Sequence, residues 1–192
     1  TNLGMLLLFA PLLRAAELGK SSLQSNLNVV LRGLDAKDTA CIFEAISHAS
    51  PGGLGESKKY DVNKRLEDGT TLQEAMMEAR NRDSIAKQYV TDFIDIFSMG
   101  YKCIGDFAVR WNSVQWAVVA CYIRFMAEFP DSHISRKFGL EVAEQIKINA
   151  VPIAKAFQKN DSPEDGAEIL MKFDGELKEK GKQLQQTLFD QQ

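Results

Sequence analysis

The chain has 192 residues, 45% of them hydrophobic, which is enough for one sizeable core and near the usual length of a single domain. Its 23 basic and 26 acidic residues give a formal net charge of -3 in short blocks, which argues against an extended nucleic-acid surface and makes any anion site local. The cysteines Cys41, Cys103 and Cys121 have no metal-ligand spacing. We expect them to be buried free thiols, and we expect the protein to be cytoplasmic because thiols stay reduced there.

The first element is the apolar run "LGMLLLFAPLL" at residues 3–13. It is too short to span a bilayer, contains Pro11 and lacks the basic leader of a secretory signal, so no membrane partner is expected. Apolar residues continue on all sides from Leu3 to Leu18, which predicts a central core helix kinked or restarted at Pro11. The chain opens inside this run without a Met, and we expect further sequence upstream.

Helical periodicity continues over residues 23–34 behind serine caps, and a new helix is predicted to start at Asp35. Residues 50–70 are poor in apolar side chains and show neither helical nor strand periodicity, so they are predicted to form a long loop, a type of segment that is often functional. The next helix is predicted to begin at a capping box in which Thr71 pairs with Glu74.

After a break at "NRD", a second amphipathic helix is predicted with Ile85, Tyr89, Phe93, Ile96 and Phe97 on one face. A core helix then ends at Pro130, another follows, and the last begins at "SPEDG" with proline in its first turn. No segment alternates as a strand does. The sequence therefore predicts an all-α fold: an irregular, bundle-like array of about eight to ten helices forming one domain over residues 1–192.

The loop "SPGGLGES" at 50–57 lacks the spacing of a P-loop or of a dinucleotide fingerprint. The backbone N–H groups of its three glycines, with lysines close behind, suit an anion, whereas a helix cap followed by a turn needs the same glycines. Polar groups that a simple turn would not require follow the glycines. The candidates in this loop are Gly52, Gly53, Gly55, Glu56, Lys58 and Asp61.

The segment "EARNRDSIAKQY" at 78–89 places basic residues around Asp83 at a helix junction, where Asp83 or Ser84 is suited to cap the next turn. It is either a substrate-anion site beside a carboxylate or a capped helix start with solvated ion pairs. Asp92 lies one or two turns beyond Lys87 and Tyr89, and it is either turned to the same cleft or an ordinary surface residue.

The segment "FPDSHISRKFG" at 129–139 joins a helix end to a new helix that Asp131 or Ser132 caps, and Arg136 and Lys137 follow. Backbone donors at such a start suit an anion. With two histidines and dispersed acidic residues, the sequence carries no metal-ligand signature.

Four segments, in order, resemble the triphosphoribosyl-dephospho-coenzyme A synthase family of helical ATP-dependent enzymes. They are "TNLG" at 1–4, "PGGLGESKKYDV" at 51–62, "LQEAMMEARNRDSIAKQYVTDF" at 72–93 and "PDSHISRKFG" at 130–139. The similarity runs from Thr1 to about Leu184. The resemblance favours a functional loop over residues 50–61.

The resemblance implies an enzyme that moves the 5-triphosphoribosyl group of ATP to dephospho-coenzyme A and releases adenine, for the prosthetic group of citrate lyase or malonate decarboxylase. ATP and dephospho-coenzyme A are the expected partners, and Mg²⁺ is a possible cofactor. A ribose hydroxyl of the acceptor attacks C1′ of the ATP ribose, which calls for cations at the triphosphate and a carboxylate at the reaction centre. The residues expected to bind phosphate are Gly52, Gly53, Gly55, Lys58, Arg82, Arg136 and Lys137. Asp83 or Asp92 is expected to supply the carboxylate, with support from Glu56, Asp61, Ser84, Tyr89 and Asp131.

Family members carry an upstream segment with a Pro-Lys-Pro-Gly type motif, and this chain starts after it. They also continue into a segment resembling Asn-Pro-Gly-Thr-Thr, whereas here Leu184 is followed by "QQTLFDQQ". A fragment, an alternative gene model and a degenerate relative are three explanations of these departures. Two alternatives stay open. One is a non-catalytic helical relative that binds nucleotide or a protein partner, and the other is a transferase with a different acceptor.

Overall fold

The computed structural model describes residues 2–19, 21–49, 59–62, 64 and 69–189. These residues contain α-helices, one π-helix and turns, with no strand, so the all-α prediction is confirmed. The chain divides into two compact units, residues 1–98 and 99–192, and whether they form one domain stays a prediction.

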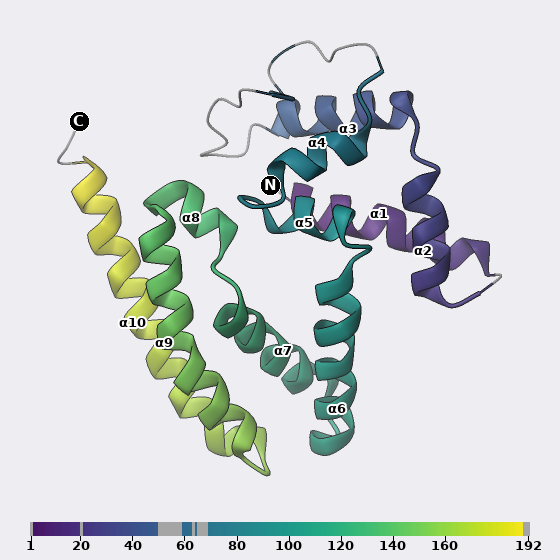
Figure 1. Cartoon of the computed structure of the whole chain (residues 1–192). Helices are drawn as coiled ribbons and strands as arrows, with labels where there is room; N and C mark the ends of the chain where they lie inside the picture. The colour runs from purple at the N-terminus through teal and green to yellow at the C-terminus, as the bar shows by residue number, and fades with distance from the viewer. Residues whose placement is uncertain (1, 20, 50–58, 63, 65–68, 190–192) are drawn as a thin grey trace. The chain divides into compact units, whose positions relative to one another are not determined.

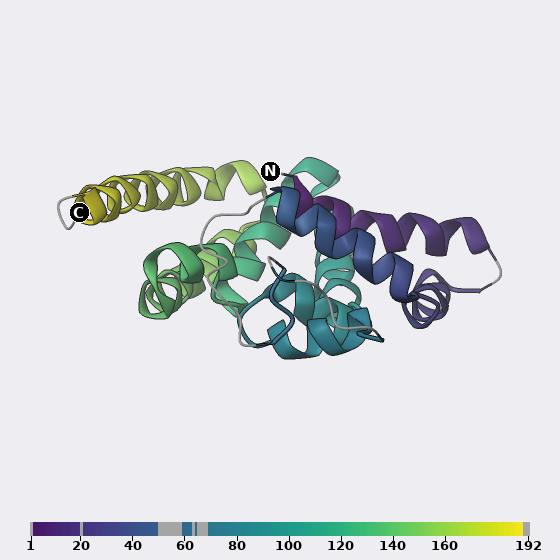
Figure 2. The ribbon, with the colours of Figure 1, turned by 90° about the horizontal axis from the view of Figure 1, so that it is seen from above.

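The described part of the first unit contains five α-helices (Figure 1). They are α1 (Leu3–Leu18), α2 (Leu23–Arg32), α3 (Ala36–Ala49), α4 (Leu72–Ala79) and α5 (Ser84–Val90). Helix α1 packs against α2, α3 and α5, and α4 packs against α5 (Figures 1 and 2). Their shared core includes the fully buried side chains of Ala15, Leu27 and Phe93.

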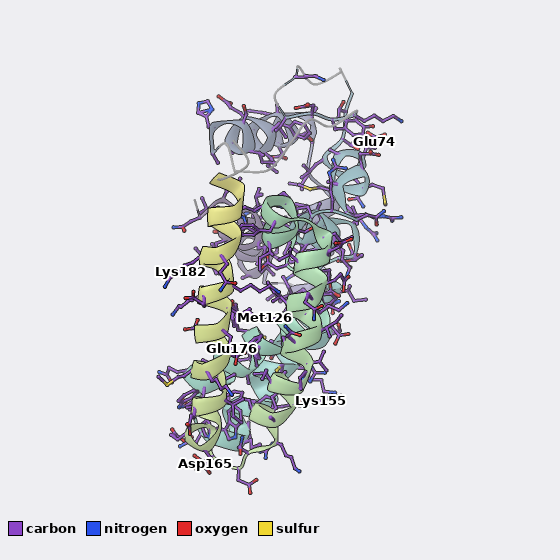
Figure 3. All side chains as sticks on the ribbon, turned by 90° about the vertical axis from the view of Figure 1, so that its left-hand side faces the viewer. Glu74, Met126, Lys155, Asp165, Glu176 and Lys182 are labelled. Atoms are coloured by element: carbon purple, nitrogen blue, oxygen red, sulfur yellow. The ribbon has the colours of Figure 1, made fainter. Side chains whose placement is uncertain are left out.

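The second unit starts inside a π-helix, η1 (Ile96–Tyr101), and its described residues continue with five α-helices. They are α6 (Lys102–Trp111), α7 (Val114–Glu128), α8 (Ser132–Phe138), α9 (Leu140–Lys159) and α10 (Pro163–Phe189). Helix α7 packs against α6 and α9, and α9 packs against α8 and α10. Figure 3 shows α9 and α10 side by side, with charged residues such as Lys155 on α9 and Glu176 on α10.

Helix α1 forms where the apolar run predicts it and continues through Pro11, but it is not buried on all sides. Only Pro11 and Ala15 are buried, because the neighbouring helices of the unit contact one side of α1. The prediction of a central core helix is therefore wrong. The opposite side exposes Met5, Leu6, Phe9 and Leu13.

Two further predictions are corrected by burial and backbone geometry. Cys41 is exposed, whereas Cys103 and Cys121 are buried, and all three are free thiols. Burial raises the pKa of Cys121 to about 11 and raises that of Cys103 as well.

The amphipathic helix predicted over residues 85–97 instead stops at Val90, and the chain turns before η1.

Tyr89 satisfies a backbone carbonyl that proline leaves without its helical partner. Pro11 has no N–H, so it cannot donate to the carbonyl of Leu7, four residues earlier in α1. The Tyr89 hydroxyl donates to the Leu7 oxygen at 2.7 Å, although 82 residues separate the two positions. This hydrogen bond fastens α5 to α1, and the surrounding core raises the pKa of Tyr89 to about 12.

We expect Tyr89→Phe to lower the free energy of unfolding by about 1–3 kcal/mol at neutral pH, because the Leu7 carbonyl loses its donor. The difference between the two proteins should shrink as the pH rises from about 10 towards 12. Over that range unfolded tyrosine ionises while folded Tyr89, with its raised pKa, still holds its proton, so only the wild type loses stability through this group. Urea unfolding at pH 7 and pH 10.5 measures both effects, and an undiminished difference at pH 10.5 would contradict the second.

Candidate functional site

Helix α4 begins with the predicted capping box. The Thr71 side chain accepts from the Glu74 backbone N–H at 3.2 Å, and Glu74 accepts in return from the Thr71 N–H at 3.0 Å. The backbone N–H and then the hydroxyl of Thr71, which both donate to the exposed Glu74 carboxylate, lower the pKa of this carboxyl. The sequence prediction for this helix start is confirmed.

A shallow pocket of about 310 Å³ lies between α4 and the end of the glycine-containing loop. It is lined by Lys59, Tyr60, Gln73, Glu74, Met77 and Glu78. Two carboxylates beside one ammonium group do not favour a triphosphate. The loop candidates Gly52, Gly53, Gly55, Glu56 and Lys58 lie outside the described residues.

Asp61, in contrast, is described, and its side chain is buried although it follows a polar loop. Its Oδ2 lies 3.8 Å from Nζ of Lys64. The preceding residue, Tyr60, has a φ of 53°, in the left-handed region that residues other than glycine, asparagine and aspartate rarely adopt. Asp61 therefore belongs to the local structure at the base of the loop.

Asp83 is the N-cap of α5, as one of the two interpretations of its segment predicts. Its Oδ1 accepts from the backbone N–H groups of Ile85 at 2.9 Å and Ala86 at 3.0 Å. The carboxylate is half-buried, whereas Arg82 and Ser84 on either side are exposed. The consecutive residues Arg82 and Asp83 thus lie at the junction between α4 and α5.

Helix α5 ends in an unusual turn at Asp92. The Phe93 N–H donates to the Gln88 carbonyl at 2.9 Å, the six-residue hydrogen bond of a Schellman motif. Asp92 has a φ of 53° and occupies the position that glycine normally takes, and Phe93 follows with a φ of 58°. The full burial of Phe93 in the core holds this strained backbone in place.

The same turn brings back Asp95, a carboxylate that the sequence analysis did not select. Its Oδ2 forms an ion pair with Nζ of Lys87 at 2.8 Å and accepts a hydrogen bond from Nε2 of Gln88, also at 2.8 Å. The side chain of Asp95 is 15% exposed. The spacing from Lys87 to Asp95 is eight residues, which in a continuous helix would separate them by about two turns. Helical periodicity therefore gave no signal for this contact.

In the second unit, Asp131 caps α8. Its Oδ1 accepts from the backbone N–H groups of His133 at 2.7 Å and Ile134 at 3.0 Å, so an anion at this helix start would compete with the carboxylate. Arg136 and Lys137 lie in the last turn of α8. Arg136 is half-buried and Lys137 is exposed, 5.0 Å from the centre of the Phe138 ring.

The site candidates thus fall into two groups. Arg82, Asp83, Ser84, Tyr89 and Asp92 occupy α5 and its two ends, and Asp131, Arg136 and Lys137 occupy α8 and its cap. Tyr89 is buried and donates its hydroxyl to Leu7, so its contact within the first unit is structural. Among the described residues no group of three or more His, Cys, Asp or Glu side chains is arranged to hold a metal ion.

The family model for ATP:dephospho-CoA triphosphoribosyl transferase, CitG, matches residues 1–182. The chain belongs to this family. The match covers most of the chain, including both groups of site candidates, and the family is one of transferase enzymes that use ATP as a substrate. Neither a curated protein nor a solved structure matches the chain.

Membership in the triphosphoribosyl transferase family agrees with the resemblance found in the sequence. Within the described part of the chain, no helix has the length and apolar character needed to cross a bilayer. The family match does not assign roles to individual residues, so the site residues named above stay predictions.

Proposed function

We propose that this protein transfers the 5-triphosphoribosyl group of ATP to a ribose hydroxyl of dephospho-coenzyme A and releases adenine. The observation that carries the proposal is the family match over residues 1–182. We further propose that the product serves as the prosthetic-group precursor of citrate lyase or malonate decarboxylase, and that the reaction takes place in the cytoplasm.

The chemistry divides into holding the triphosphate and stabilising the reaction centre. We assign phosphate binding to the glycine-containing loop, Arg82, Arg136 and Lys137, because guanidinium and ammonium groups bind phosphate oxygens strongly. Asp83 or Asp92 supplies negative charge near C1′, where an oxocarbenium-like centre develops as adenine leaves. Asp83 suits this role because its two backbone hydrogen bonds fix the direction of the carboxylate.

We propose that Mg²⁺ enters the site as part of the substrate. The described residues contain no three-ligand cluster for a resident ion. Magnesium that arrives on a triphosphate usually keeps several waters and takes only one or two protein carboxylates.

The test is adenine release from ATP by the complete protein, measured with and without dephospho-coenzyme A. We expect adenine only when the acceptor is present, in equal amount to the triphosphoribosylated product. Adenine release that is independent of the acceptor, or none at all from folded protein that binds ATP, would contradict the transferase proposal.

A matched pair of arginine variants tests the phosphate assignment in the same assay. Arg82 and Arg80 are both exposed near the start of α5, and the Arg80 guanidinium contacts the Met77 sulfur at 2.8 Å. We expect Arg82→Gln to raise the KM for ATP roughly 10-fold, because one charged hydrogen bond to phosphate is lost, and Arg80→Gln to leave it unchanged. Equal effects of the two substitutions on the KM for ATP would show that Arg82 does not bind phosphate.

A further inference from the structure

The Asp95 carboxylate is held by two side chains, whereas a surface ion pair needs only one partner. Both donors, Nζ of Lys87 and Nε2 of Gln88, approach the same oxygen, Oδ2, at 2.8 Å. Oδ1 receives no hydrogen bond from the described residues, and the side chain is 15% exposed, so solvent reaches part of it. The result is a carboxylate with a fixed direction and one oxygen left for another donor.

The arrangement leaves a buried oxygen of Gln88 without a hydrogen bond from the described part of the chain. Its side chain is buried, and its Oε1 has no hydrogen-bond partner among the described residues. A buried acceptor without a donor costs about 1–3 kcal/mol. Turning the amide over would place Oε1 against Asp95 Oδ2, so the amide keeps its N–H₂ towards the carboxylate and leaves its oxygen unsatisfied.

Backbone strain is concentrated in the same short segment. Asp92 and Phe93 are consecutive left-handed residues, and the π-helix η1 begins directly after Asp95. Left-handed non-glycine residues and π-helical turns both cost free energy and occur often at functional sites. The turn at Asp92 is what returns the chain so that Asp95 meets Lys87 and Gln88.

We propose that Asp95 is the proton acceptor for the attacking ribose hydroxyl, with Lys87 and Gln88 as its positioning residues. This inference rests on the proposed transferase function and adds a residue to it. Asp83 or Asp92 keeps the electrostatic role at C1′. A free, oriented carboxylate oxygen is the group that a hydroxyl donor needs, because it accepts the hydrogen bond before it takes the proton.

The step balances without an added oxidant or reductant. The hydroxyl proton passes to Asp95 Oδ1 as the hydroxyl oxygen forms a bond to C1′ of the ATP ribose. The bond from C1′ to N9 of adenine breaks, and its electron pair leaves with the base. Adenine takes up one proton from water, Asp95 returns one to water, and the triphosphate stays on the transferred ribose.

The test replaces Asp95 by asparagine in the complete protein and measures acceptor-dependent adenine release. The side-chain carbonyl of the asparagine can still accept from Lys87 and Gln88, so the fold should survive while the base is lost. We expect kcat to fall about 100-fold or more, with KM for both substrates changed less than about threefold. Asp106→Asn, at an exposed carboxylate on α6, serves as the control and should retain wild-type kcat.

Two comparisons separate catalysis from a structural ion pair. Lys87→Met breaks the same pair from the other side, so equal losses of kcat and of thermal stability in Lys87→Met and Asp95→Asn would overturn the proposal. Formate should restore the kcat of Asp95→Ala at least about 10-fold by acting as a replacement base, and a formate-insensitive variant would also overturn it.

The wild-type assay keeps the two proposals apart. Absence of acceptor-dependent adenine release from the wild type contradicts the transferase function itself. A wild type that is active, beside an Asp95→Asn variant that keeps more than about a tenth of its kcat, contradicts only the role of Asp95.

Discussion

Asp83→Asn should lower kcat for acceptor-dependent adenine release about 100-fold while leaving the free energy of unfolding within about 0.5 kcal/mol of the wild type. Asparagine caps helices about as well as aspartate, so it can keep the hydrogen bonds to the backbone of Ile85 and Ala86. The substitution removes the negative charge that the proposal places near C1′, and little else.

Asp83→Ala is the matched variant for this prediction. It removes both the charge and the cap, and it should cost about 1 kcal/mol of stability in addition to the same loss of kcat. Kinetics and urea unfolding on both variants separate the two contributions. If Asp83→Asn is fully active and only Asp83→Ala is impaired, Asp83 is a helix cap alone and the carboxylate at C1′ must be sought at Asp92.

The second large effect concerns the core of the second unit. Phe157 is fully buried, and its ring lies 5.2 Å from the ring of Trp111 and 6.1 Å from that of Trp116. Gly166 on α10 lets this ring approach, since a Cβ there would lie 2.6 Å from Cδ2 of Phe157. The aromatic cluster therefore joins α6, α7, α9 and α10.

Phe157→Ala should lower the free energy of unfolding of this unit by about 3–5 kcal/mol, because it leaves a cavity between four helices. Both tryptophans of the chain belong to the cluster, so tryptophan fluorescence during urea unfolding reports on this unit. Tyr122→Ala, at a side chain that is 66% exposed, should change stability by less than about 0.5 kcal/mol. Similar effects of the two substitutions would show that the Phe157 cluster is not the core of the unit.

Much of the candidate site follows from local sequence signals. Asp83 and Asp131 each sit just before a helix, and each accepts two backbone N–H groups as a cap, which is one of the interpretations that the sequence allowed for both segments. Such contacts join residues two or three positions apart, so their geometry is set by the local chain. The family resemblance includes the same segments, and the family match covers them.

The contact between Asp95 and Lys87 could not be predicted from such local signals. A continuous helix over residues 85–97 would place Asp95 about two turns from Lys87, and the apolar spacing of the segment favoured such a helix. The left-handed turn at Asp92 and Phe93 is stabilised by the burial of Phe93 in a core built from distant residues. Local periodicity carries no information about that burial, and so it missed the contact.

The sequence by itself determined the helical class, the capping box at Thr71 and the helix starts after Asp83 and Asp131, because helical periodicity and capping act over one or two turns. Only the tertiary structure decided that α1 exposes one apolar side, that Tyr89 satisfies the Leu7 carbonyl across 82 residues, and that Asp95 turns back to Lys87. These contacts depend on which helices meet in space, and long-range packing overrides the local preferences of a segment when it buries enough apolar surface.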